Sequence, residues 1–310
     1  MYPKPATMMT RSLCRGKPET VVPVTRVQIL GILNITRDSF SDGGRYLAPD
    51  HALAHARQLV ADGADIIDIG AESTHPDAED VPAAEEIARL TPVIAALRTD
   101  GVCVSVDTHK PAVMRAVLDL GVELINDVTA LREPDAVDAV RGSSARIILM
   151  HSTASVARAE RAGADPGTIV EHMVAFFEQR IAVLEAAGLR RERLVLDPGM
   201  GFFLGRDPAL SLVVLRSLPQ LAALGLPLCV STSRKSFIGA VLGVATVPRP
   251  VEQRSAGTLA TELWAALHGV QYVRTHDVRA LRDVLRMWEA LQGPLEPGSP
   301  RDLPAPPCGR

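Results

Sequence analysis

Aromatic residues, cysteines and long apolar runs are all scarce in this chain of 310 residues. Only 4% of the residues are aromatic, and the four cysteines (Cys14, Cys103, Cys229 and Cys308) are scattered without a CxxC pair. This spacing predicts neither a disulfide framework nor a zinc site. The longest apolar runs are shorter than a membrane span, and residues 1–23 lack the apolar core of a secretory signal. We therefore expect no membrane partner and a cytoplasmic location.

An excess of either charge is lacking too. The 33 Lys and Arg residues nearly balance the 36 Asp and Glu residues, which leaves a formal net charge of −3. Nucleic-acid partners usually require a strongly basic surface, so we expect none. What the chain does have is a hydrophobic content of 47%, which is ample for the core of a large soluble domain.

The two ends of the chain differ from the middle in composition. Residues 1–25 mix Pro, Arg, Lys and Thr without periodicity, and residues 293–310 are rich in Pro and Gly. Such segments bury little apolar surface, so we expect two poorly ordered tails. The residues between them, 26–292, are expected to form a single domain.

Short runs rich in β-branched and aliphatic residues recur eight times between the tails. Nearly continuous apolar runs of this length are typical of strands that are buried on both faces of a parallel sheet. The eight predicted strands are residues 27–35, 65–70, 102–107, 123–127, 145–151, 193–197, 226–231 and 271–275.

Amphipathic stretches separate these runs, and several of them start at Pro and end at Gly, as helices do. Eight strands alternating with helices over about 260 residues predict an α/β fold, the (β/α)₈ TIM barrel. A doubly wound open sheet is the alternative. It usually has fewer strands, and no GxGxxG follows the first run, so the barrel is favoured. Predicted helices include residues 51–62, 83–98, 111–120, 166–187, 208–224 and 253–267.

Polar residues follow nearly every predicted strand. The active site of such a barrel is built from the loops at the carboxyl ends of its strands. Any single acid there can instead cap the next helix. Capping does not explain polar side chains at all the strand ends, so we predict a catalytic pocket. These residues are Asn34, Asp68, Glu72, Asp107, Asn126, Asp127, His151, Asp197, Ser233, Arg234, Lys235, Arg274, His276 and Asp277.

The polar residues fall into two groups by charge. Carboxylates and an amide at the earlier strands suit a heterocycle that carries many N–H donors. Basic and hydroxyl side chains at the last two strands predict an anion site, at the place where barrels often bind phosphate. The first group is Asp68, Asp107, Asn126 and Asp197, and the second is Ser233, Arg234, Lys235, Arg274 and His276.

Eight segments that include these residues resemble the dihydropteroate synthases, the folate-pathway family of pterin-binding barrel enzymes. Each segment alone is a weak signal, but their order and spacing together are specific. The resemblance extends over about residues 27–292. The segments are residues 31–44 (GILNITRDSFSDGG), 68–76 (DIGAESTHP), 105–110 (SVDTHK), 125–128 (INDV), 149–151 (LMH), 196–202 (LDPGMGF), 233–239 (SRKSFIG) and 274–278 (RTHDV).

This resemblance implies the condensation of 6-hydroxymethyl-7,8-dihydropterin diphosphate with p-aminobenzoate, which releases pyrophosphate. It implies Mg²⁺ as cofactor, no covalent nucleophile, and a homodimer formed through outer helices late in the barrel. The implied catalytic and pterin-binding residues are Asp107, Asn126, Asp197 and Lys235, with Met150 packing nearby. The diphosphate would contact Asn34, Thr74, Arg274 and His276, with Asn34 also binding the metal. The p-aminobenzoate pocket would comprise Thr74, His75, Pro76, Ser233 and Arg234.

The chain departs from the usual family pattern in the loops around the implied p-aminobenzoate pocket. Arg37 stands where the family usually has Pro, and residues 74–77 read THPD instead of a basic-polar TRPG. Further departures lie at residues 152–153 and 203–204. These replacements resemble the mobile, sulfonamide-insensitive branch of the family, so we expect tolerance of sulfonamides.

Two other functions remain open at the level of sequence. A methyltetrahydrofolate-binding methyltransferase domain shares Asp and Asn residues at its strand ends, but it has no diphosphate to bind. A non-catalytic pterin-binding paralogue is supported only by the altered loop at His75 and Asp77. Release of pyrophosphate from the pterin diphosphate is expected of the synthase and of neither alternative.

Overall fold

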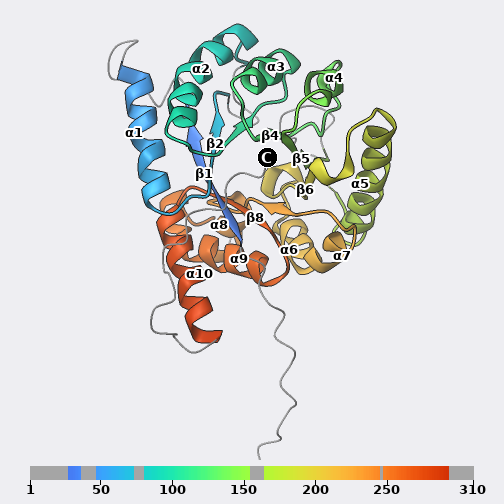
Figure 1. The fold of residues 1–310 in the computed structure, drawn as a ribbon. Helices are drawn as coiled ribbons and strands as arrows, with labels where there is room; N and C mark the ends of the chain where they lie inside the picture. The colour runs from blue at the N-terminus through green and yellow to red at the C-terminus, as the bar shows by residue number, and fades with distance from the viewer. Residues whose placement is uncertain (1–26, 36–46, 73–79, 154–163, 245–246, 293–310) are drawn as a thin grey trace, which may run out of the picture.

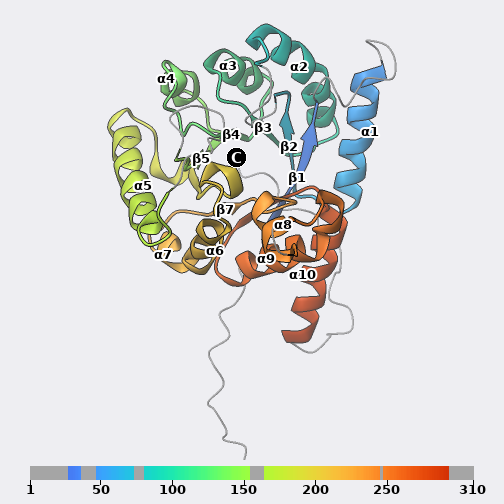
Figure 2. The ribbon, with the colours of Figure 1, turned by 180° about the vertical axis from the view of Figure 1, so that it is seen from behind.

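The eight predicted strands form one parallel sheet, which confirms the (β/α)₈ barrel (Figure 1). The computed structural model describes residues 27–35, 47–72, 80–153, 164–244 and 247–292. The strand order is β6-β5-β4-β3-β2-β1-β8-β7. A single parallel bridge between Leu196 and Leu228 joins the two ends of this order. The ring is therefore nearly closed, and helices surround it in both views (Figures 1 and 2).

Every strand lies within a run that the sequence predicts, because buried β-branched runs bounded by Gly and Asp are a strong signal. The strand that differs most is β7, which is reduced to two residues. The strands are β1 Gln28–Asn34, β2 Ile66–Gly70, β3 Val104–Asp107, β4 Leu124–Asp127, β5 Arg146–Met150, β6 Leu194–Asp197, β7 Cys229–Val230 and β8 Tyr272–Thr275.

The helices agree with the prediction less closely. The helix predicted over residues 208–224 is two helices, α6 and α7, because Pro219 cannot donate a backbone hydrogen bond inside a helix and starts a new one instead. The α-helices are α1 Leu47–Ala61, α2 Ala83–Thr99, α3 Pro111–Asp119, α4 Ala136–Arg141, α5 Ile169–Ala186, α6 Pro208–Arg216, α7 Leu218–Ala222, α8 Ser236–Leu242, α9 Ser255–Leu267 and α10 Val278–Gln292. Short 3₁₀ helices lie at Arg191–Arg193, Gly201–Phe203 and Val251–Gln253.

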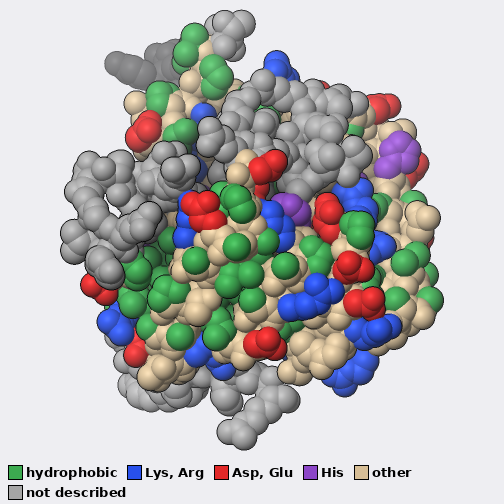
Figure 3. All heavy atoms as spheres, turned by 90° about the horizontal axis from the view of Figure 1, so that it is seen from above, with side chains coloured by type: hydrophobic (Ala, Val, Ile, Leu, Met, Phe, Trp, Pro, Cys, Tyr) green, Lys and Arg blue, Asp and Glu red, His purple; other side chains and the backbone are tan. Residues whose placement is uncertain are grey.

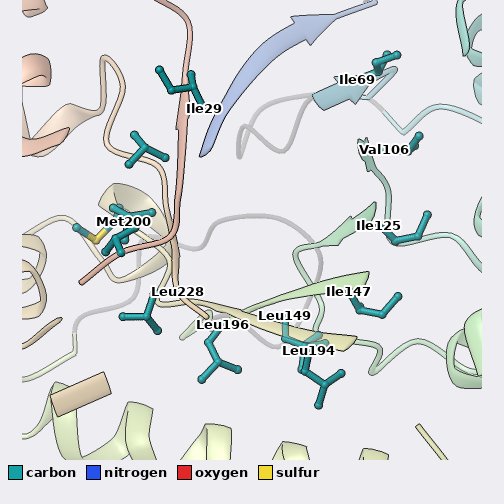
Figure 4. Close-up of a cluster of buried hydrophobic side chains, with 14 of the residues drawn as sticks. Ile29, Ile69, Val106, Ile125, Ile147, Leu149, Leu194, Leu196, Met200 and Leu228 are labelled. Carbon is teal, nitrogen blue, oxygen red and sulfur yellow. The ribbon is translucent and has the colours of Figure 1, made fainter. Parts of the chain in front are cut away.

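Two apolar layers hold the barrel together, because alternate side chains of a strand point to opposite faces. The larger layer lies between the strands and the helices, and Figure 4 shows part of it, including Ile29, Ile69 and Leu196. The smaller layer fills the inside of the barrel, and we call it the barrel floor. The floor consists of Leu30, Ile66, Cys103, Leu124, Ile148, Val195, Cys229 and Tyr272.

The two described cysteines both belong to this floor. Cys229 is free and fully buried, as expected of a small apolar side chain. Cys103 is buried too, but it is disulfide-bonded, which corrects the expectation drawn from the absence of a CxxC pair. Proximity in space rather than spacing in sequence decides whether two thiols can join.

The predicted tails, residues 1–25 and 293–310, lie outside the described residues. Among the described helices, none has the length and apolar content that a membrane crossing requires. The face seen in Figure 3 mixes Lys and Arg with Asp and Glu, and hydrophobic side chains lie between them. Neither sign of charge dominates this face.

Candidate active site

Polar side chains occupy the inside of the barrel directly above the floor. A step of two residues along a strand keeps a side chain on the same face. On β2 this step leads from Ile66 to Asp68, and on β4 it leads from Leu124 to Asn126. We call the resulting set the polar layer: Asp68, Ser105, Asp107, Asn126, Asp197 and Arg274.

Arg274 lies at the centre of the polar layer. Its Nε donates to Asp68 Oδ2 at 2.5 Å, and its Nη2 donates to Asp107 Oδ2 at 2.9 Å. Asn126 Nδ2 donates to the same oxygen of Asp68 at 3.4 Å. The sequence suggested that the carboxylates and the basic residues form separate groups, but Arg274 joins them. This happens because β8 neighbours β1, which brings its inward side chains across from those of β2 and β3.

The protonation of this cluster follows from two carboxyl groups sharing one guanidinium. Burial raises the pKa of Asp107 to about 7, against the lowering effect of Arg274 and with a further rise from Asp68. Burial opposes the charge on Arg274, but the two carboxylates outweigh it and raise the pKa of the guanidinium above its ordinary value. Arg274 therefore remains a cation, whereas Asp107 titrates near neutral pH.

A second charged pair lies at β6 and the start of α8. Burial lowers the pKa of Lys235 to about 8, although the nearby Asp197 carboxyl acts in the opposite direction. Burial also raises the pKa of Asp197, while Lys235 and the Gly199 N–H lower it. Lys235 Nζ donates to the Met200 carbonyl at 3.1 Å and lies 5.4 Å from the centre of the Phe203 ring.

The turn after β6 requires glycine to hold these groups in place. Asp197 Oδ1 accepts a hydrogen bond from Gly199 N at 2.7 Å. Gly199 has a φ of +66°, and a Cβ there would lie 2.3 Å from the His151 carbonyl oxygen. A larger residue would therefore be strained and would push the turn away from β5.

Hydroxyl and imidazole groups follow β7 and β8. His276 Nδ1 lies 2.9 Å from Ser233 Oγ, and the His276 backbone N–H donates to the same oxygen at 3.2 Å. Burial lowers the pKa of His276 to about 4, and the cations Arg234, Arg274 and Lys235 lower it further. His276 is thus neutral at pH 7. Arg234 itself is exposed and has a left-handed φ of 60°.

Three of the six buried side-chain atoms that lack a hydrogen-bond partner in the described part of the chain belong to this site, and the other three belong to Glu86 and Glu262. The three at this site are Asp68 Oδ1, Ser105 Oγ and His151 Nδ1. Buried polar groups are almost always paired, so these atoms show that the cluster is not fully satisfied by hydrogen bonds within the described residues. The accessible part of the layer is formed by Asp107 and Arg274, whose side chains are 14% and 17% exposed.

The structure describes only some of the other predicted site residues. Met150 is buried, and it pairs in register with Asp197. Asn34 is exposed at the end of β1, and its Oδ1 lies 3.9 Å from where a Cβ on Gly70 would be. Thr74, His75 and Pro76, together with Arg37, lie outside the described residues.

Two residues of the polar layer were not carried into the site predicted from the resemblance. Asp68 was grouped with the acids that suit a heterocycle, but it was left out of the site residues that the resemblance implies. Ser105 was missed, although its position two residues before Asp107 is the signal that could have revealed it. Inward alternation identifies such residues once the strand register is known.

Comparison with known proteins agrees with this geometry. Residues 30–276 match the model of the family described as "Pterin binding enzyme". A type-2 dihydropteroate synthase from Escherichia coli is 48% identical over 265 residues, which are 85% of this chain and 96% of that protein. The chain belongs to the dihydropteroate synthases. A type-3 dihydropteroate synthase from Escherichia coli is 45% identical and covers 85% of this chain and 99% of its own length.

Solved dihydropteroate synthases share the fold. The Xanthomonas albilineans enzyme with 4-aminobenzoic acid superimposes with a TM-score of 0.79 at 41% identity, covering 87% of this chain and 94% of its own. The same enzyme in complex with 7,8-dihydropteroate gives a TM-score of 0.75 at 40% identity, covering 88% and 96%. Our chain is accordingly a transferase of folate biosynthesis, and the dihydropteroate synthase predicted from the sequence is confirmed.

Proposed function

We propose that the enzyme binds the pterin of 6-hydroxymethyl-7,8-dihydropterin diphosphate in the polar layer and transfers its methylene carbon to p-aminobenzoate. Asp107, Asn126, Asp197 and Lys235 would hydrogen-bond the ring, and Met150 would pack against it. The observation that carries this assignment is the cluster in which Arg274 binds both Asp68 and Asp107 while the side chains of Arg274 and Asp107 stay 17% and 14% exposed. The N–H groups of a pterin suit such carboxylate acceptors.

The same residues suit the chemistry of the reaction. Negative charge develops on the departing pyrophosphate, and fixed donors stabilise it. Arg274 uses Nε and Nη2 on carboxylates, and its Nη1 makes no hydrogen bond with a described residue, so it can contact a phosphate oxygen. Neutral His276 adds a further donor. The cation that remains on the pterin lies beside carboxylates, and the amine attacks it without a covalent enzyme intermediate and then releases its extra proton to the pyrophosphate or to water.

Mg²⁺ is proposed as the cofactor that accompanies the diphosphate. The amide oxygen of Asn34 is a hard ligand of the kind that Mg²⁺ prefers, and Asn34 is exposed at the carboxyl end of β1. Among the described residues, no group of three or more His, Cys, Asp and Glu side chains is arranged to hold a metal. This donor set fits an ion that takes most of its ligands from phosphate and water. Bound there, Mg²⁺ would neutralise charge on the leaving group.

The p-aminobenzoate pocket is proposed to lie between Ser233, Arg234 and the loop that contains Thr74, His75 and Pro76. The departures at Arg37 and His75 fall in this region of the sequence. Together with the similarity to the type-2 and type-3 synthases, they support tolerance of sulfonamides. We expect sulfonamides to inhibit this enzyme more weakly than a synthase that has Pro and TRPG at these positions. Equal inhibition of the two enzymes would contradict this proposal.

A homodimer is proposed through the face formed by α8, α9 and the segment between them. Large apolar side chains are exposed there, which is typical of a surface that another chain covers. Val244 and Val247 form an isolated bridge and are 77% and 70% exposed, and Val241, Val251 and Trp264 are further exposed hydrophobic residues of this part of the chain. Light scattering of the purified chain should give twice the monomer mass, and Val244→Asp should halve it. A monomeric wild type would refute the dimer.

The decisive experiment is pyrophosphate release from the pterin diphosphate with Mg²⁺, with and without p-aminobenzoate. Release that depends on p-aminobenzoate, accompanied by dihydropteroate, is the expected result. Chelation of the metal should abolish it, and added Mg²⁺ should restore it. Absence of release from folded protein would favour the methyltransferase or the non-catalytic paralogue instead.

A further inference from the structure

Glu262 is a buried carboxyl group that the proposed chemistry does not use. It lies on α9 at one helical face with Thr258, Ala265 and Ala266, all of them buried. Its exposed fraction is 0%, and neither carboxyl oxygen makes a hydrogen bond of standard geometry with a described residue. An ionised carboxylate is very costly in such a place. The surroundings of Glu262 therefore favour its protonated, neutral carboxyl group.

Thr275 is the neighbour that connects Glu262 to the active site. Arg274 points into the barrel, so the next residue on β8 points outward, towards the helices. The Thr275 hydroxyl lies near enough to Glu262 to lower the pKa of that carboxyl, but burial is the larger effect and raises it to about 8. Glu262 is thus neutral at pH 7.

A continuous path of polar atoms runs from Thr275 to His276. Thr275 Oγ1 lies 3.4 Å from Ser233 Oγ, which in turn lies 2.9 Å from His276 Nδ1. Thr275 is fully buried and Ser233 is 5% exposed, so water competes little for these bonds. Backbone N–H groups add to the path: that of Asp277 donates to Thr275 Oγ1, and that of His276 donates to Ser233 Oγ.

Counting donors gives the direction of this path when Glu262 is protonated. Each hydroxyl has one proton to donate. If Glu262 is protonated, it donates to Thr275, Thr275 donates to Ser233, and Ser233 donates to Nδ1 of His276. The imidazole proton then sits on Nε2. If Glu262 is ionised, Thr275 donates to it, and Ser233 can donate either to Thr275 or to Nδ1 of His276, so the Nε2–H tautomer is no longer enforced.

We propose that Glu262 is a positioning residue: as a buried proton donor it orients the hydrogen bonds through Thr275 and Ser233, so that His276 presents Nε2–H to the diphosphate. This inference rests on the proposed role of His276 in binding that diphosphate. Glu262 itself touches no substrate. It acts through the tautomer of His276, because the hydrogen bond made by one ring nitrogen decides which nitrogen carries the proton.

The direct test is ¹⁵N NMR of the full chain labelled at histidine, with the resonances of His276 assigned by the loss of signal in His276→Gln. The wild type should show Nε2–H as the dominant tautomer at pH 7. Glu262→Met removes the donor at similar volume, and Thr275→Val removes the middle hydroxyl; both should give a mixture of tautomers. Glu262→Gln keeps an N–H donor and should retain the wild-type spectrum.

Kinetics provide the second measurement. Losing one aligned hydrogen bond to an anion should raise KM for the pterin diphosphate about three- to tenfold in Glu262→Met and Thr275→Val. KM for p-aminobenzoate should stay unchanged, and Glu262→Gln should behave as the wild type. A purely structural role would lower the melting temperature without this selective change.

Two outcomes would overturn the proposal: an Nδ1–H tautomer in the wild type, or a wild-type tautomer in Glu262→Met. The NMR measurement needs no turnover. If the tautomer shifts as expected but the wild type releases no pyrophosphate, the positioning role stands and the proposed function fails.

Discussion

The barrel floor and the polar layer lie on the same strands, two residues apart, yet they do opposite things. Ile66, Leu124 and Val195 fill the floor, and the residues two positions later are Asp68, Asn126 and Asp197. The side chains of the floor are apolar apart from Tyr272, whose hydroxyl accepts a hydrogen bond from Arg146. The polar layer, in contrast, keeps acceptors unpaired.

The residues that stabilise this fold and the residues proposed to bind its substrate therefore lie in different layers of the same strands. Apolar packing in the floor stabilises the ring whatever binds above it. The polar layer holds buried charges whose desolvation disfavours folding unless they are paired, as Arg274 is with Asp68 and Asp107. Substitutions in the two layers should therefore affect different measurements.

Arg274→Met should give the largest effect. It removes the proposed phosphate donor and leaves Asp68 and Asp107 without their cation. We expect kcat/KM for pyrophosphate release to fall by about 10³-fold, by analogy with the loss of other fixed charge-stabilising donors. Activity within tenfold of the wild type, in protein that remains folded, would show that Arg274 only holds the carboxylates.

Ile148→Ala tests the floor in isolation. The side chain is fully buried on β5, and its loss leaves a cavity inside the ring. The free energy of unfolding should drop by about 3 kcal/mol, within the usual range for such truncations. Denaturant titration measures this, and kcat/KM should stay within about twofold per folded molecule. A large loss of activity would mean that the two layers are not separable.

Asp107→Asn should change how stability depends on pH. The folded pKa of about 7 lies above the ordinary value of 3.8, so the folded state holds a proton that the unfolded state loses. This contribution is complete below pH 3.8 and is lost as pH rises to 7. Relative to the wild type, the variant should gain on the order of 4 kcal/mol between pH 4 and pH 7, about 1.4 kcal/mol for each pH unit. Parallel pH profiles of the two proteins would place the titration elsewhere.

Arg279→Met should have the smallest effect and serves as a matched control for Arg274→Met. Arg279 also donates to a carboxylate, that of Asp62, but its side chain is 66% exposed and the pair lies on the surface. Exposed pairs contribute little because water and salt screen them. The melting temperature and kcat/KM should both be unchanged. A clear loss would mean that charge alone, independent of burial, explains the Arg274 result.

Much of the fold could be predicted from the sequence because its signals are local. Buried strands bounded by Gly, such as residues 65–70, and the polar residues that follow them need no long-range information. The contact between Arg274 and Asp68 joins residues 206 positions apart and depends on β8 lying beside β1. Glu262 could not be found either, because helical periodicity gives the face of α9 but not the Thr275 hydroxyl opposite it.

The ring is joined unevenly around its circumference. Between β1 and β2 five residue pairs are in register, whereas β6 meets the β7 segment through the Leu196–Leu228 bridge and the bond from Leu196 N to Pro227 O. We call this junction between β6 and the β7 segment the seam. Local opening of the barrel should occur there first, so amide hydrogens at the seam should exchange sooner than those of β1. Asp197 stands on one side of the seam and Lys235 on the other. Opening it would widen the gap between the two groups proposed to hold the pterin, which would give the product a way out without unfolding the rest of the ring.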